Sequence, residues 1–143
     1  MRSAAMLVMP MAVFGCAAIH QTPTFVDAPN GIAYRLGEYN DILAVTVSAV
    51  DSDKVLWKVK CNSRYALGST KFDAFDYGKV PVNMDEVVAP AELKAGDKVV
   101  VDIHYQYDRL CGACGSTIRE EFEVVQPNKF RWIKRDWAAP IAR

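Results

Sequence analysis

The chain has 143 residues, 51% of them hydrophobic, and its 17 basic residues balance its 17 acidic ones. This length suits one domain with a core large enough to fold without stabilising disulfides. Residues 127–143 carry five basic side chains and one acidic one, whereas residues 16–126 carry eleven basic and sixteen acidic. Because the body is mildly acidic and no basic stripe follows any one element, we exclude nucleic acid as the main partner.

The first residues have the pattern of an export signal. Arg2 supplies a positive charge, residues 4–14 are predominantly apolar, and Gly15 and Cys16 follow them. The apolar run is too short to span a bilayer, which is typical of a secretory signal peptide. We therefore expect residues 1–15 to be removed on export.

Residues 13–16, Val-Phe-Gly-Cys, resemble the lipobox of bacterial lipoproteins, in which the cysteine is lipidated and becomes the mature N-terminus. The resemblance implies that Cys16 joins the protein to a membrane, and two or more acyl chains anchor stably at about 0.8 kcal/mol per buried methylene. By resemblance to sorting in Gram-negative bacteria, Ala17 after the cysteine implies the outer membrane, facing the periplasm. The alternatives are an ordinary signal peptide cut near Ala17 and Ala18, or an apolar segment that packs on the domain.

A tether is expected next, over residues 16–30. This segment contains Pro23 and Pro29 and shows no apolar period. Such a composition favours an extended chain without regular pairing. We therefore place the folded domain at residues 31–126.

Beyond residue 30 the apolar side chains alternate at the two-residue period of a β-strand. Strands are predicted over 42–50 and 54–61, and the turn residues 51–53, Asp-Ser-Asp, join them into a hairpin. The side chains expected to face the core are Leu43, Val45, Val47 and Ala49 in the first strand and Val55, Trp57, Val59 and Cys61 in the second.

Three further strands are predicted. An aromatic-rich segment at 70–77 breaks the alternation, which indicates a bulged or an edge strand. The clearest strand covers 98–107, a loop follows at 108–115, and the last long strand covers 116–125. Their expected inward side chains are Val99, Val101, Ile103, Tyr105 and Tyr107, then Ile118, Phe122 and Val124.

No segment after residue 16 shows a sustained helical period with caps, so six or seven short strands predict an all-β, antiparallel sandwich. The large aromatic Trp57 on an early strand and the turn at 91–97 resemble those of immunoglobulin-like and fibronectin-like domains. The resemblance covers residues 32–125 and implies an immunoglobulin-like β-sandwich. It implies no activity, because a fold does not determine function.

The sequence Cys-Gly-Ala-Cys at 111–114 is the one motif with chemical content. Export permits disulfides, and Cys111 and Cys114 can close a small ring. Redox enzymes place this spacing at a helix N-terminus, which lowers the thiol pKa, whereas here it lies on a predicted hairpin loop. We therefore predict a structural disulfide between Cys111 and Cys114.

Cys61 is a second candidate partner for either cysteine. Strand 54–61 would pair antiparallel with strand 98–107 if the sheet is immunoglobulin-like. Cys61 would then lie at the opposite end of its strand from loop 108–115, which carries Cys111 and Cys114, and a strand of eight residues is about 26 Å long. A disulfide needs Cα atoms within about 7 Å of each other. We therefore expect Cys61 to remain a buried thiol that packs as a small hydrophobic side chain.

Other chemical groups favour no catalytic or metal site. A zinc or copper site joining His104 to the three cysteines beyond residue 16 has suitable ligand types, but His104 alternates onto the polar face of its strand. The second histidine, His20, lies in the expected tether, so a Ser-His-Asp arrangement has no base. No glycine-rich phosphate loop is present. We predict no catalytic residue, no metal and no cofactor.

Residues 127–143 interleave basic and aromatic side chains. Tryptophan and arginine favour protein interfaces and anionic surfaces. The alternative is a final strand whose Phe130, Trp132 and Ile133 cover an open edge of the sandwich. The candidate interface residues are Phe130, Arg131, Trp132, Lys134, Arg135 and Trp137.

These features predict a non-enzymatic, lipid-anchored protein of the cell envelope. We expect it to bind a protein partner through loop 108–115 and the C-terminal segment, because a rigid sandwich positions its loops for recognition. The alternative is a periplasmic thiol-redox or metal-handling protein that acts through Cys111 and Cys114.

Overall fold

The computed structural model describes residues 22–37, 40–62, 72–106 and 115–134. All regular structure in these ranges is β-strand, so the all-β prediction is confirmed for the described residues. The described ranges contain no helix long and apolar enough to cross a membrane. The strands are β1 (Thr24–Val26), β2 (Ile32–Arg35), β3 (Asp41–Ala49), β4 (Val55–Cys61), β5 (Ala74–Phe75), β6 (Met84–Val88), β7 (Lys98–Gln106), β8 (Gly115–Gln126) and β9 (Lys129–Ile133).

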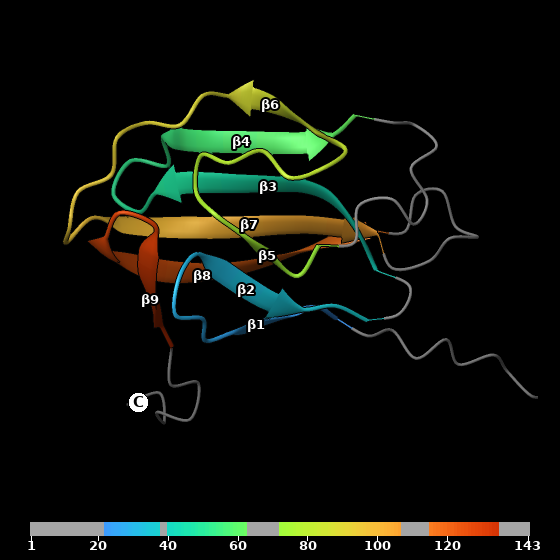
Figure 1. Ribbon diagram of the computed structural model, residues 1–143, viewed down its shortest axis with the longest axis horizontal. Coiled ribbons are helices and arrows are strands. Elements are labelled where there is room, and N and C mark those ends of the chain that lie inside the picture. The colour runs from blue at the N-terminus through green and yellow to red at the C-terminus, as the bar shows by residue number, and fades with distance from the viewer. Residues whose placement is uncertain (1–21, 38–39, 63–71, 107–114, 135–143) are drawn as a thin grey trace, which may run out of the picture.

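The strands form two antiparallel sheets. The small sheet has the order β1-β2-β5, and the large sheet has the order β6-β4-β3-β7-β8-β9. Figure 1 shows the small sheet lying in front of the large one, so the sheets make two layers. This arrangement is compatible with the predicted β-sandwich.

The core lies between the layers because one face of each sheet is apolar. Trp57 on β4 is fully buried, as predicted, and its ring lies 5.8 Å from that of Phe75 and 5.5 Å from that of Tyr77. Phe75 belongs to the small sheet, so Trp57 packs across the two layers. The other fully buried apolar side chains are Ile32, Tyr34, Ile42, Val45, Val47, Val59, Val99, Val101, Ile103 and Val124.

The predicted hairpin is present as β3 and β4, but three of its side chains differ from expectation. Cys61, expected to be buried, is only half-buried. Ile42 is buried in place of Leu43. The β3–β7 register shifts between Ile42 and Ala44, so the side chain of Ile42, and not that of Leu43, lies on the inner face of the sheet. Val55 lies beyond a second register shift in the β3–β4 pair and is 36% exposed. Regular alternation cannot anticipate either shift.

The predicted pairing of strands 54–61 and 98–107 is wrong. β3 lies between β4 and β7 and is antiparallel to both, so β4 and β7 run in the same direction. Cys61, the last residue of β4, therefore lies at the end of the sheet where Gln106 pairs with Gly115. The strand length that excluded Cys61 as a disulfide partner therefore no longer separates it from the end of β7. The pairing that an immunoglobulin-like sheet implies is absent from the large sheet.

Residues 24–26, which the sequence assigned to a tether, form β1 and pair with β2. Phe25 is 4% exposed, and its ring makes edge contacts with Tyr34 at 6.3 Å and Phe122 at 5.4 Å. Three residues are too few to show a period. The folded structure therefore includes part of the segment expected to be a tether.

The other predicted strands are present with small differences. The edge strand expected within 70–77 is β5, which has two residues and lies at the edge of the small sheet. β7 and β8 match the strands predicted at 98–107 and 116–125 to within one residue at each end. Tyr107 lies outside the described residues.

Asn128, in the β8–β9 turn, joins three segments. Its carbonyl accepts a hydrogen bond from the N–H of Gly31 at 2.7 Å, and its side-chain oxygen accepts one from the N–H of Tyr77 at 3.1 Å. Its amide donates to the Asp76 carboxylate at 2.8 Å. Its φ of 55° is left-handed, which asparagine adopts more readily than most residues. The turn therefore links the small sheet to the large one.

Gly31→Ala is expected to destabilise the fold more than Gly96→Ala, although both glycines have positive φ, at 67° and 93°. A Cβ atom at Gly31 would lie 2.5 Å from the Phe75 carbonyl oxygen, whereas nothing lies within 4 Å of a Cβ at Gly96. In urea denaturation we expect the free energy of unfolding to fall by about 1 kcal/mol for Gly96→Ala and about 3 kcal/mol for Gly31→Ala. Equal losses would contradict the close approach of Gly31 to β5.

Candidate functional site: a groove at the edge of the sandwich

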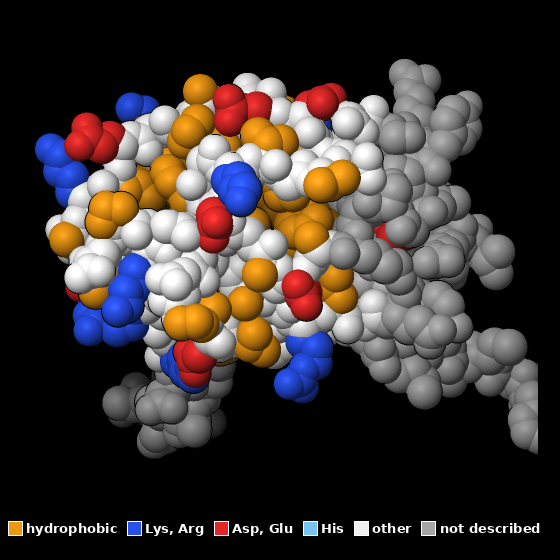
Figure 2. Space-filling view, in the orientation of Figure 1, with side chains coloured by type: hydrophobic (Ala, Val, Ile, Leu, Met, Phe, Trp, Pro, Cys, Tyr) orange, Lys and Arg blue, Asp and Glu red, His pale blue; other side chains and the backbone are white. Residues whose placement is uncertain are grey.

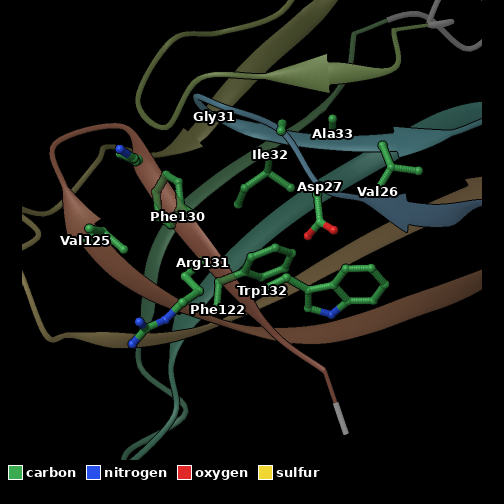
Figure 3. A pocket seen from close by; sticks show the side chains of 12 residues that line it. Val26, Asp27, Gly31, Ile32, Ala33, Phe122, Val125, Phe130, Arg131 and Trp132 are labelled. Atoms are coloured by element: carbon green, nitrogen blue, oxygen red, sulfur yellow. The ribbon is translucent and has the colours of Figure 1, made fainter.

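A groove opens between the two sheets, with the end of β1 and the start of β2 on one side and the edge strand β9 on the other. Its volume is about 340 Å³. Figure 3 shows Phe122, Phe130 and Trp132 on one side and the chain from Val26 to Ala33 on the other. The lining residues are Val26, Asp27, Ala28, Gly31, Ile32, Ala33, Phe122, Val125, Lys129, Phe130, Arg131 and Trp132.

β9 places the predicted aromatic side chains along this groove. Phe130 pairs with Val124, and Trp132 pairs with Phe122, so both aromatic residues face inward. Phe130 is 8% exposed and Trp132 is half-buried. This segment is thus a final strand that covers an edge, which was the alternative to a solvent-exposed interface. Ile133 was expected to cover the edge as well, but it alternates to the opposite face.

Aromatic rings form the floor of the groove. The Trp132 ring is stacked on Phe122 at 6.5 Å and contacts Phe25 at 6.2 Å. The ammonium group of Lys134 lies 4.9 Å from the centre of the Trp132 ring and 2.8 Å from an oxygen of Asp27. Both charged side chains are largely exposed, so their ion pair stabilises the fold by about 1 kcal/mol or less.

The rim of the groove on β9 is basic. Arg131 donates a hydrogen bond to Glu123 on β8 and is 66% exposed. Lys129 is exposed, and no residue that the structure describes forms an ion pair with it. Asp27 supplies one carboxylate on the opposite side. The groove therefore combines an aromatic floor with cationic groups on one side.

The indole N–H of Trp132 is buried and has no acceptor among the described residues. A buried donor left without a partner costs about 1–3 kcal/mol, and such groups are uncommon in native proteins. This N–H is closed off from solvent, so the polar groups that the groove presents to a ligand are the charged side chains of Asp27, Lys129 and Arg131.

The wider face that carries the small sheet has a mixed surface. Figure 2 shows hydrophobic side chains on it with acidic and basic side chains between them. No single sign of charge dominates this view. The groove is distinguished from it by its aromatic floor rather than by a strong electrostatic field.

Among the described residues, the pKa values that shift clearly belong to three groups. Burial raises the pKa of Tyr34, and nearby Asp73 raises it further. Burial also raises the pKa of Tyr77, despite an opposing hydrogen bond to Ala91, and hydrogen bonding to Asp102 raises that of Arg119. All three groups therefore keep their protons at neutral pH, and none is tuned for proton transfer there.

The structure brings together Phe130, Arg131, Trp132 and Lys134 from the predicted interface. Arg135 and Trp137 lie outside the described residues. Sequence reasoning missed the wall that β1 and the start of β2 contribute, because a three-residue strand has no visible period.

The predicted cysteine sites, Cys16 for lipid and Cys111 with Cys114 for a disulfide, also lie outside the described residues. Within the described part of the chain, no three His, Cys, Asp or Glu side chains come together to hold a metal. No protein-family model matches this chain, and neither a curated protein nor a solved structure matches it. The groove is therefore interpreted from its own geometry.

Proposed function

We propose that this protein is a non-enzymatic, lipid-anchored component of the cell envelope that binds another protein in the groove between β1 and β9. The observation that carries the proposal is the aromatic floor of Phe122, Phe130 and Trp132 beside the cations Lys129 and Arg131. Aromatic residues and arginine are enriched at protein interfaces and dominate their binding energy. A groove of this size admits a few side chains of a partner.

The proposed anchor is Cys16, in the lipobox-like sequence. Eight residue steps separate Cys16 from Thr24, the first residue of β1. Even a fully extended chain of that length spans only about 28 Å. The groove, which β1 borders, would therefore stay close to the periplasmic surface of the outer membrane, and its partner would be found there.

The chemistry of the groove selects the partner. Apolar side chains would pack on the aromatic floor, and acidic side chains would pair with Lys129 and Arg131 on the rim. We therefore propose a protein segment that combines apolar and acidic side chains.

Substitution of Cys16 tests the envelope assignment. In bacterial cells fed with labelled palmitate, the wild-type chain should incorporate label and sediment with outer membranes. Cys16→Ser should abolish labelling and release the protein, because serine cannot form the thioether. Cys61→Ser is the matched control and should keep both properties. Equal labelling of wild type and Cys16→Ser would contradict the lipid anchor.

A second candidate function is thiol-redox or metal-handling activity through Cys111 and Cys114. The strand order supports this candidate function. It puts Cys61, a third thiol, at the same end of the sheet as Gln106 and Gly115, the residues on either side of the 107–114 connection. Peptide mapping without reductant, followed by measurement of the disulfide potential, distinguishes the two functions. An easily reduced bond favours redox chemistry, and an inert bond favours a structural role.

A further inference from the structure

The outer face of the large sheet, which points away from the small sheet, carries a shallow depression of about 710 Å³. It shares no lining residue with the groove between β1 and β9. The residues that line it are Ala44, Thr46, Lys58, Asp102, His104, Thr117 and Arg119. They come from four adjacent strands, β4, β3, β7 and β8, in the middle of the sheet.

The strand register arranges the depression in two rows. One row across the strands is Lys58, Thr46, Asp102 and Arg119, and the next is Lys60, Ala44, His104 and Thr117. The short side chains of Ala44 and Thr46 on β3 form the floor. Longer side chains on the neighbouring strands form the walls, so the concavity follows from residue size.

Hydrogen-bond donors dominate the walls. The one carboxylate, that of Asp102, accepts two hydrogen bonds from Arg119, at 2.7 and 2.9 Å, which neutralise it. Nδ1 of His104 lies 3.1 Å from the hydroxyl of Thr117. No ion pair joins Lys58 to any residue in the described ranges. With Lys58 and Arg119 against Asp102, the lining residues of the depression therefore carry a net charge of +1, which Lys58 supplies.

We infer that this depression binds an acidic polysaccharide through the carboxylates of its sugar units. A carboxylate above Ala44 and Thr46 would accept from the Lys58 ammonium group and from the Thr46 hydroxyl. Such charge-assisted bonds are stronger than neutral ones. The paired groups of Asp102 and Arg119 offer acceptors and donors to sugar hydroxyls.

The dimensions favour a polymer. Lys58 and Arg119 are three strand spacings apart, which is about 14 Å. A single small anion cannot reach both, whereas an extended chain lying across the strands can. A membrane surface fits less well, because no aromatic or large apolar side chain lines the depression to enter a bilayer. The inference stands apart from the proposed groove and anchor, since it uses a different face.

The test is calorimetric titration of the full-length protein with a short oligogalacturonate, compared with the same oligomer methyl-esterified to remove its charge. We expect the charged oligomer to bind and the ester not to bind. Lys58→Gln should weaken binding about tenfold, the value of one charge-assisted hydrogen bond. Thr46→Leu should abolish binding, because the larger side chain fills the floor and leaves the charge intact.

Lys79→Gln is the matched control, because Lys79 is exposed and lies outside the depression. It should bind like wild type, and thermal unfolding should show that all three variants are folded. The inference is overturned if the ester binds equally, if Lys79→Gln weakens binding as much as Lys58→Gln, or if no charged oligomer binds. Binding to phosphatidylglycerol vesicles in place of the oligomer would overturn it in favour of a membrane surface.

Discussion

Trp57→Ala is expected to lower the free energy of unfolding by about 4 kcal/mol, as removal of a large core aromatic does. Trp57 is fully buried and packs on Phe75 and Tyr77, so alanine leaves a cavity between the layers. A domain of this size has a total stability of about 5–15 kcal/mol. Urea denaturation followed by circular dichroism should therefore show a much lower midpoint.

The matched control is Val82→Ala, because Val82 is 81% exposed. Its stability should stay within about 0.5 kcal/mol of wild type. A loss below about 1 kcal/mol for Trp57→Ala, near the ordinary effect of a point mutation, would show that the two layers are not packed as described.

A chain ended after Gln126 is expected to lose cooperative folding, whereas a chain ended after Lys134 should keep it. The shorter chain lacks β9, the buried Phe130 and the three links made by Asn128. It would also expose the edge of β8 that pairs with β9 in the full chain. Thermal melts and the dispersion of amide signals in NMR spectra distinguish the two chains.

The comparison decides between the two interpretations of the basic aromatic segment. If the chain ended after Gln126 melts like wild type, β9 is dispensable for folding and serves only as an interface. If that chain fails to fold, Phe130 and Trp132 are structural as well as exposed to the groove. The contacts of Trp132 with Phe25 and Phe122 favour the second result.

Strands with long, regular alternation were predictable from the sequence. β7 buries every second residue from Val99 to Tyr105, so its period alone identifies both its extent and its inner face. The β3–β4 hairpin was predictable because short polar residues mark its turn, where Asp53 has a φ of 54°. In both cases the signal is local, within one strand or one turn.

The order of strands in the sheet was not predictable from alternation. Alternation says which face of a strand is buried but not which strand lies beside it. The position of β3 between β4 and β7 therefore became clear only from the structure, and it reversed the expected location of Cys61. β1 was missed for another reason: Phe25 is a single buried residue between prolines, which shows no period.

The same distinction applies to the sites. Residue types marked Phe130, Arg131 and Trp132 as an interface, but the opposing wall at Asp27 and Gly31 depends on how the small sheet packs on the large one. The depression around Thr46 depends on register across four strands, which no single segment records. Local composition can indicate a binding residue, but the concave surface around it is set by long-range pairing.

The central claim, that the groove between β1 and β9 binds an envelope protein, is tested most directly by site-specific photo-crosslinking in intact cells. A photoreactive residue at Lys129 on the groove rim should give one discrete adduct, and the same residue at Lys54, in the β3–β4 turn and outside the groove lining, should give none. Arg131→Glu should remove the adduct, because it places a repelling charge beside the acidic partner. No adduct from position 129, or one that also forms from position 54 and survives Arg131→Glu, would contradict the claim.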